Sequence, residues 1–126
     1  MDTLYVPDSH LRLFEQPDGT IRVSLSDHLL RQLGRPTWAE WSAAPGAELP
    51  PGVPFASVET EKTVYEVALP FPAVYVGLNP DVQANPSILR ALARNAGWLC
   101  AVRPAPGTDW RAGLLDEDAY AAFVAP

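Results

Sequence analysis

Prolines are the feature of this chain that most restricts its fold. The 126 residues include 14 prolines, most of them between Pro36 and Pro86, with two more at Pro104 and Pro106. Proline lacks a backbone N–H and has a fixed φ angle, so it interrupts helices and is excluded from the inner strands of a sheet. The spacing therefore predicts many short elements joined by turns rather than a few long helices.

Length and composition predict a single folded domain that covers residues 1–126. A chain of 126 residues is long enough to bury one hydrophobic core. Its hydrophobic content of 48% and charged content of 19% are typical of a folded protein and not of a disordered one. The net charge of −6 argues against nucleic acid as a partner, because binding to phosphates requires a basic surface.

The sequence contains no clear signal for a membrane or for an oxidising compartment. No apolar run approaches the roughly 20 residues of a membrane-spanning helix, so no membrane partner is expected. The first residues, Met1–Tyr5, lack the basic start of a signal peptide, and we therefore expect a cytoplasmic protein. The one cysteine, Cys100, cannot form a disulfide within the chain.

The first third of the chain predicts a hairpin followed by a short helix. Two β-prone runs, Leu11–Phe14 and Thr20–Leu25, flank the turn sequence Gln16–Gly19, which is typical of a hairpin. Ser26 then precedes leucines at helical spacing, and Gly34 follows them. We therefore expect a helix of about two turns that is capped by Ser26 and ended by Gly34.

The rest of the chain predicts a mainly β fold with short helices at its edges. Further strands are expected at Thr37–Trp41, Phe55–Thr60, Thr63–Leu69, Ala73–Leu78 and Gly97–Val102. Loops are expected at 43–54 and 79–86, a helix at Ser87–Arg94, and a last helix after Asp116 with Tyr120 and Phe123 facing inward. This order indicates a small barrel or sandwich with helical decoration.

The only lysine of the chain, Lys62, has an unusual setting. It lies between two predicted strands, and the Glu61-Lys62 pair lacks the Asn-Gly or Asp-Gly sequence that tight hairpin turns favour. Glu59 and Glu61 give it an acidic neighbourhood that a modifying enzyme could read. A lysine amine on its long flexible stem is a good attachment point for a covalently bound group. A solvated lysine on a surface turn is the simpler alternative.

The residues around Lys62 resemble a known family. Val58–Lys62 is similar to the lipoyl-attachment hairpin of lipoyl carrier domains, and nearly the whole chain resembles the H-protein of the glycine cleavage system. The matching segments follow the family's order: Asp18–Val23, Leu25–His28, Leu33-Gly34, Gly52, Pro54-Phe55, Asn79, Asn85-Pro86, Gly97–Leu99, Leu114–Asp116, Ala119-Tyr120 and Ala122-Phe123.

The resemblance implies a lipoyl-domain-like barrel-sandwich hybrid, mainly β, with short peripheral helices and a C-terminal helix. It implies that Lys62 carries covalently bound lipoic acid, installed by a lipoate ligase or lipoyltransferase, and that Glu59 takes part in recognition during lipoylation. It implies a non-catalytic carrier and not an enzyme. The arm would take an aminomethyl group from glycine decarboxylase, pass it to an aminomethyltransferase and be reoxidised by dihydrolipoamide dehydrogenase. The cofactor would hold the redox chemistry, and the protein would present it.

Several positions depart from the family's pattern. The residue before the lysine is usually apolar in H-proteins and is Glu61 here. After Gly34 the family favours aspartate, whereas this chain has Arg35, and Ala73 stands where a glycine is usual. Two alternatives therefore stay open. One is a lipoate-binding carrier of another pathway, such as sulfur-compound oxidation, with the counterpart enzymes of that pathway. The other is an unmodified H-protein-like interaction module.

Other polar residues give weaker signals. His10 and His28 are eighteen positions apart and have no third ligand at metal-binding spacing, so hydrogen-bonded or surface roles are expected and no metal site. Cys100 lies between apolar neighbours in a predicted strand, which predicts a buried thiol and not a nucleophile. Trp98 is expected in the core. No residue is predicted to be catalytic.

Overall fold

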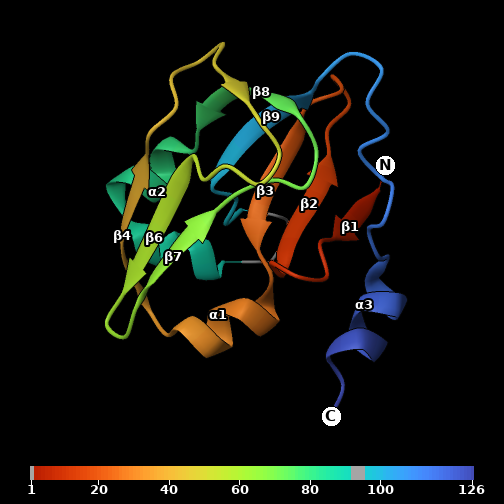
Figure 1. The fold of residues 1–126 in the computed structure, drawn as a ribbon. Coiled ribbons are helices and arrows are strands. Elements are labelled where there is room, and N and C mark those ends of the chain that lie inside the picture. Colours follow the sequence, from red (N-terminus) through yellow and green to blue (C-terminus); the bar gives the residue numbers. More distant parts are fainter. Residues whose placement is uncertain (1, 92–95) are drawn as a thin grey trace.

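The computed structural model describes residues 2–91 and 96–126 (Figure 1). The strands are β1 (Thr3–Tyr5), β2 (Leu11–Glu15), β3 (Ile21–Leu25), β4 (Pro36–Trp41), β5 (Glu48–Leu49), β6 (Ala56–Thr60), β7 (Val64–Val67), β8 (Ala73–Leu78) and β9 (Cys100–Pro104). The helices are α1 (Asp27–Leu33), α2 (Pro80–Ala84), the 3₁₀ helix η1 (Pro86–Arg90) and α3 (Glu117–Val124).

The strands form two antiparallel sheets. The larger sheet has six strands in the order β1-β2-β3-β9-β8-β5, and the smaller sheet has three in the order β4-β6-β7. The helices lie at the periphery, with α3 beside β1 and α1 next to the tip of the β6–β7 hairpin at the bottom of Figure 1. The prediction of a mainly β fold with short peripheral helices is confirmed. No helix within the described residues is long and apolar enough to cross a membrane.

One hydrophobic core joins the two sheets. The predicted first hairpin is present as β2 and β3, and its inward-facing side chains are fully buried: Leu11, Leu13, Ile21, Val23 and Leu25. Val58 of β6 and Val67 of β7 enter the same core from the smaller sheet. Burying a side chain of this size stabilises the fold by about 1.5–3 kcal/mol relative to leaving it exposed. The alternating pattern thus fixes which face of each hairpin is hidden.

The helix α1 begins and ends where the sequence predicts. The Ser26 hydroxyl accepts a hydrogen bond from the backbone N–H of Leu29 at 3.2 Å, which caps the first turn. Gly34 ends the helix with a φ of +87°, a conformation that residues with a side chain adopt only under strain. The chain therefore turns sharply into β4, which places Gly34 beside the end of the β6–β7 hairpin.

The middle of the chain differs from the prediction at several points. The segment 79–86 is not simply a loop, because the Asn79 side chain accepts the Asp81 N–H at 3.0 Å and caps α2. The helix expected at Ser87–Arg94 is the 3₁₀ helix η1 in its described part, and its remainder falls partly on residues 92–95, outside the described residues. The strand expected at Gly97–Val102 begins later, at Cys100. The strands β1 and β5 were not predicted, since elements this short show no usable periodicity.

The C-terminal helix is only partly as predicted. The Asp116 side chain caps α3 by accepting the Ala119 N–H at 2.8 Å. Tyr120 is buried and stacks on Tyr5 with ring centroids 4.3 Å apart, as expected of an inward-facing residue. The inward placement of Phe123 is wrong, because its side chain is 53% exposed. The helix lies at the edge of the larger sheet against β1, so one narrow face of it is covered.

Candidate functional site

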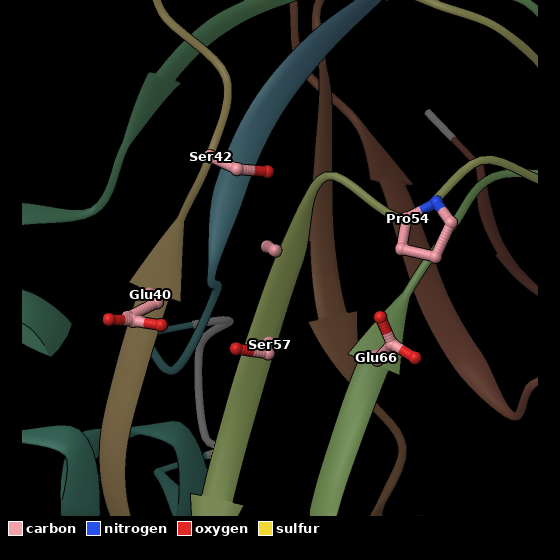
Figure 2. A pocket seen from close by; sticks show the side chains of 6 residues that line it. Glu40, Ser42, Pro54, Ser57 and Glu66 are labelled. Atoms are coloured by element: carbon pink, nitrogen blue, oxygen red, sulfur yellow. The ribbon is translucent and has the colours of Figure 1, made fainter.

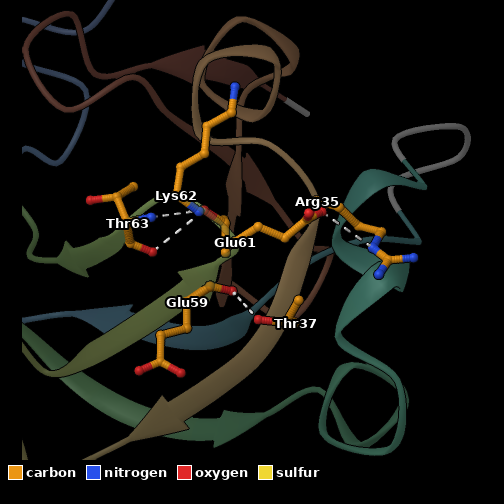
Figure 3. Close-up of polar contacts among 7 residues, drawn as sticks. Arg35, Thr37, Glu59, Glu61, Lys62 and Thr63 are labelled. Atoms are coloured by element: carbon orange, nitrogen blue, oxygen red, sulfur yellow. Dashed lines mark hydrogen bonds and ion pairs between the residues drawn. The ribbon is translucent and has the colours of Figure 1, made fainter.

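Lys62 lies at the turn between β6 and β7 (Figure 3), and the Thr60 side chain organises that turn. The Thr60 hydroxyl oxygen accepts hydrogen bonds from the backbone N–H groups of Lys62 and Thr63, each at 3.2 Å. The Thr60 N–H in turn donates to the Thr63 carbonyl at 2.9 Å. A side chain therefore supplies the turn contacts in the absence of an Asn-Gly sequence. Sequence reasoning missed this role, although a threonine two residues before the lysine is a recognisable signal for it.

The Lys62 side chain leaves the turn along the end of α1. Lys62 is exposed, and among the described residues none forms a hydrogen bond or ion pair with its amine. A Cβ placed on Gly34 would lie 3.7 Å from Lys62 Cε and 3.8 Å from Cδ, so the stem passes close to this glycine. Figure 3 shows the amine at the far end of an extended stem, pointing away from the hairpin. The group is accessible to a modifying enzyme.

Glu61 forms an ion pair with the end of α1. Its Oε1 lies 3.9 Å from Arg35 Nε, and both side chains are largely exposed, which makes the pair weak in water. Glu61 and Arg35 are two of the positions at which the chain departs from the family's pattern. The structure therefore brings these two departures together as opposite charges beside the lysine (Figure 3).

Glu59 does not lie beside the Lys62 amine. It is exposed on the side of β6 that faces away from the core, opposite Trp38 in the β4–β6 pairing. Its backbone carbonyl accepts the Thr37 hydroxyl at 3.2 Å, and Figure 3 shows its carboxylate pointing away from the lysine stem. The two predicted site residues therefore share one hairpin but point to different sides of it.

The core-facing side of this hairpin is tied to the turn between β1 and β2. Tyr65 is half-buried, and its hydroxyl donates to the Ser9 carbonyl. Burial raises the pKa of the Tyr65 phenol, so the hydroxyl keeps its proton and remains a donor. The side of the hairpin that faces the core is thus closed by packing and hydrogen bonding, whereas the tip and the outward side are open.

The two histidines, which are far apart in the sequence, lie next to each other in the structure. The His10 and His28 ring centroids are 4.9 Å apart, and His10 Nδ1 lies 2.8 Å from the Tyr120 hydroxyl. Burial, with a smaller contribution from His28, lowers the pKa of His10. No group of three or more possible metal ligands is found within residues 2–91 and 96–126. The cluster therefore joins α3 to the start of α1 through hydrogen bonds and ring contacts.

Cys100 and Trp98 contribute to structure. Cys100 is fully buried, and burial raises the pKa of its thiol, which disfavours the thiolate form. The expectation that Trp98 belongs to the core is not met. Its ring is partly exposed beneath the Arg22 guanidinium, which lies 4.5 Å from the ring centroid.

The family of this chain follows from comparison with known proteins. The family described as the glycine cleavage H-protein matches residues 4–126. The chain belongs to the glycine cleavage H-protein family. The glycine cleavage system H protein of Prochlorococcus marinus (strain MIT 9301) is 32% identical over 125 residues, which are 99% of this chain and 95% of that protein. The corresponding protein of Mycolicibacterium smegmatis is 30% identical over 123 residues, 96% of this chain and 93% of that protein.

A solved structure supports the same assignment. The crystal structure of a glycine cleavage system H protein from Mycobacterium marinum superimposes on this chain with a TM-score of 0.78 at 25% sequence identity. The alignment covers 96% of this chain and 94% of the chain in that structure. The two sheets are therefore the barrel-sandwich hybrid expected from the sequence. H-proteins are non-catalytic lipoyl carriers, so this chain is a carrier protein and not an enzyme.

Proposed function

We propose that this chain carries lipoic acid on Lys62 and shuttles aminomethyl groups between the enzymes of glycine cleavage. The observation that carries the proposal is that the only lysine of an H-protein family member lies at an exposed hairpin tip, where its amine pairs with none of the described residues. The relatives described above are named glycine cleavage system H proteins, which supports this pathway.

The surroundings of Lys62 fit a covalently attached arm. The turn is held through Thr60 and not through the lysine side chain, so modifying the amine costs the hairpin no contact with a described residue. Where a lipoate ligase installs the arm, ATP activates the lipoate carboxyl as an adenylate and pyrophosphate leaves. The Lys62 nitrogen then forms an amide bond with the carboxyl carbon, AMP leaves, and the amine releases a proton to solvent. When bound, lipoic acid supplies a disulfide that accepts two electrons and holds the transferred group.

The partners we propose are a lipoate ligase or lipoyltransferase, glycine decarboxylase, an aminomethyltransferase and dihydrolipoamide dehydrogenase. The chain's own contribution is presentation. A tethered arm is confined near the active site of whichever enzyme has bound the carrier, which keeps its effective concentration high. A small protein with its arm on an exposed tip can bind several enzymes in turn. We propose in addition that Glu59 is read by the enzyme that installs the arm.

Intact-mass spectrometry tests the attachment. The purified chain is incubated with lipoate–protein ligase, lipoate and ATP, and we expect a gain of one lipoyl group in the wild-type chain and none in Lys62→Arg. The matched control is Lys62→Arg with Arg31→Lys, which restores one lysine at an exposed position of α1. No gain is expected there. Wild-type protein that gains no mass, or equal labelling of the control, would refute the attachment site.

Reconstitution tests the pathway. The lipoylated chain is mixed with glycine decarboxylase and glycine, and trapping of free thiols with a maleimide reports opening of the disulfide. Thiols that appear only with glycine support the glycine-cleavage role. If the arm is installed but glycine produces no thiols, the chain serves a different set of enzymes, such as those of sulfur-compound oxidation.

A further inference from the structure

One side of the smaller sheet is largely exposed to solvent, and its residues are aligned in two rows. In the first row Glu59 lies between Trp38 and Val64, and in the second row Ser57 lies between Glu40 and Glu66. We call this side the outer face and define it by six residues: Trp38, Glu40, Ser57, Glu59, Val64 and Glu66. Because side chains alternate along a strand, all six point away from the core that Val58 and Val67 fill.

The first row exposes large apolar surface on either side of a carboxylate. Trp38 is 57% exposed and Val64 is 54% exposed, and both count among the most exposed large hydrophobic residues of the described chain. Tryptophan contributes more binding energy at protein interfaces than almost any other residue, and exposed apolar groups rimmed by polar ones mark contact surfaces. This observation is independent of the charges on the face.

The second row has carboxylates on both sides of a small hollow. Glu40 and Glu66 flank Ser57 across a hollow of about 130 Å³, which Ser42, Pro54 and Ala56 complete (Figure 2). Among the described residues, no arginine, lysine or histidine lies within ion-pair distance of Glu40, Glu59 or Glu66. A guanidinium that lies over Ser57 would have a carboxylate on each side, and one that lies on Trp38 would gain a cation–π contact beside Glu59.

These charges exclude some occupants and favour one. A second copy of the chain would place carboxylates against carboxylates, and the net charge of −6 adds to that repulsion. A basic partner would form favourable contacts with the carboxylates and would also be attracted by the net negative charge of the chain. An enzyme that joins a carboxylic acid to an amine must bind ATP and an acyl-adenylate, so the opening of its active site carries cations.

The outer face is close enough to the lysine for one enzyme to cover both. Val64 of the first row follows Lys62 by two residues and Glu66 of the second row by four, so their Cα atoms lie within roughly 7 Å and roughly 14 Å of that of Lys62. The opposite side of the hairpin is closed by the core and by the Tyr65–Ser9 hydrogen bond. An enzyme that binds this hairpin from its open side therefore contacts the outer face.

We propose that the outer face is the docking surface for the ATP-dependent enzyme that acylates Lys62, with basic side chains of that enzyme on the Glu40–Ser57–Glu66 row and on Trp38. The proposal rests on the proposed function and adds to it the surface by which the enzyme recognises the carrier. In this proposal Glu59 is one member of a larger surface that also includes an aromatic residue and two further carboxylates.

The test compares variants in binding to lipoate–protein ligase and in lipoylation by it. The first variant is Glu40→Gln with Glu66→Gln, which keeps the shape of both side chains and removes their two charges. The second variant is Trp38→Ala. The matched control, Glu117→Gln with Asp118→Asn, removes two exposed charges from α3 at the far edge of the larger sheet. Calorimetric titration gives the Kd at about 50 and about 300 mM NaCl, where screening of exposed charges differs strongly, and initial rates give KM and kcat.

We expect the Kd and the KM for the carrier to rise about threefold to tenfold in the double glutamine variant and about tenfold in Trp38→Ala, with kcat unchanged. The salt dependence should flatten in the glutamine variant, and Glu40→Asp with Glu66→Asp should restore most of it. The control should match the wild-type chain. Equal Kd and KM in all variants, or an equal loss in the control, would overturn the docking surface.

The mass of the chain at the end of the lipoylation reaction distinguishes a failure of this proposal from a failure of the proposed function. A chain that binds the ligase through the outer face but gains no lipoyl group at Lys62 refutes the attachment site and leaves the docking surface standing. A chain that is fully lipoylated with variant-independent Kd and KM refutes the docking surface and leaves the attachment site standing. Circular dichroism of each variant confirms that it is folded.

Discussion

Replacing Thr60 by valine tests whether the turn that carries Lys62 is built as the structure indicates. Valine keeps the shape of threonine and removes the hydroxyl that accepts the N–H groups of Lys62 and Thr63 at 3.2 Å. The same hydroxyl donates to the Thr63 carbonyl at 3.4 Å, a long and weak contact. Removal of this one atom therefore loosens the turn without altering the packing of β6.

The expected cost follows from the accessibility of the lost partners. A hydrogen bond whose partner can turn to water contributes about 0.5–1.5 kcal/mol, and Lys62 and Thr63 are both exposed. Two such bonds are worth about 1–3 kcal/mol, and the methyl group gained at a position only 9% exposed offsets part of this. We expect a net loss of about 1–2 kcal/mol, which lowers the Tm by roughly 3–8 °C for a domain of this size.

Thermal and urea unfolding followed by circular dichroism measure the loss, and amide hydrogen exchange at Lys62 and Thr63 locates it. Thr60→Ser keeps the hydroxyl and should preserve the protection of both amides. Thr63→Val removes a neighbouring exposed hydroxyl that makes only a 3.5 Å contact, and it should change stability by less than about 0.5 kcal/mol. A Thr60→Val chain with wild-type stability and wild-type amide protection would refute this account of the turn.

Three further predictions concern the support of the site. Gly34→Ala should lower the free energy of urea unfolding by about 1–3 kcal/mol, because the φ of +87° strains any residue with a side chain. The control is Ala91→Gly at an exposed position, which should cost about 1 kcal/mol or less. Gly97→Ala cannot serve as a control, because a Cβ there would meet backbone oxygens. Val58→Ala should cost about 2 kcal/mol because its side chain is fully buried, while Ser57→Ala on the outer face should stay within about 0.5 kcal/mol. The pKa of His10 is lowered in the folded chain, so folding disfavours protonation of this side chain. The contribution of neutral His10 to stability is therefore present above pH 6.5, the unfolded pKa. It is lost as the pH falls from 6.5 toward the folded pKa. His10→Asn, which tolerates the φ of +62°, should remove this part of the difference in unfolding free energy between pH 7 and pH 5, and an unchanged pH dependence would contradict it.

The two central hairpins could be predicted because their information is local. Leu11–Phe14 alternates, a strong turn sequence follows, and the next run alternates again, so neighbours along the chain decide the pairing. The hairpin that carries Lys62 is readable for the same reason. The segment 79–86 is predicted as a loop, but Pro80 stands at the first position of α2, where its missing N–H costs nothing.

The contacts that complete the site are not local and could not be predicted in the same way. Lys62 passes close to Gly34 and Glu61 pairs with Arg35, but each contact joins segments more than twenty residues apart. The outer face requires the register in which Trp38 opposes Glu59, and the β4–β6 pairing contains an irregularity between Pro36 and Trp38. A shift of one residue would reverse the faces. The position of the lysine at a tip could be predicted, and its neighbours could not.

The alternation of residues along β6 separates the two tasks that we propose for this hairpin. Val58 and Thr60 face inward, where the first fills the core and the second holds the turn, whereas Ser57 and Glu59 face outward. Because successive residues point to opposite sides, changes on one side leave the other in place. The inward residues should therefore control stability and the geometry of Lys62, and the outward residues should control affinity for the enzyme. An outward substitution that destabilises the chain as much as an inward one would contradict this division.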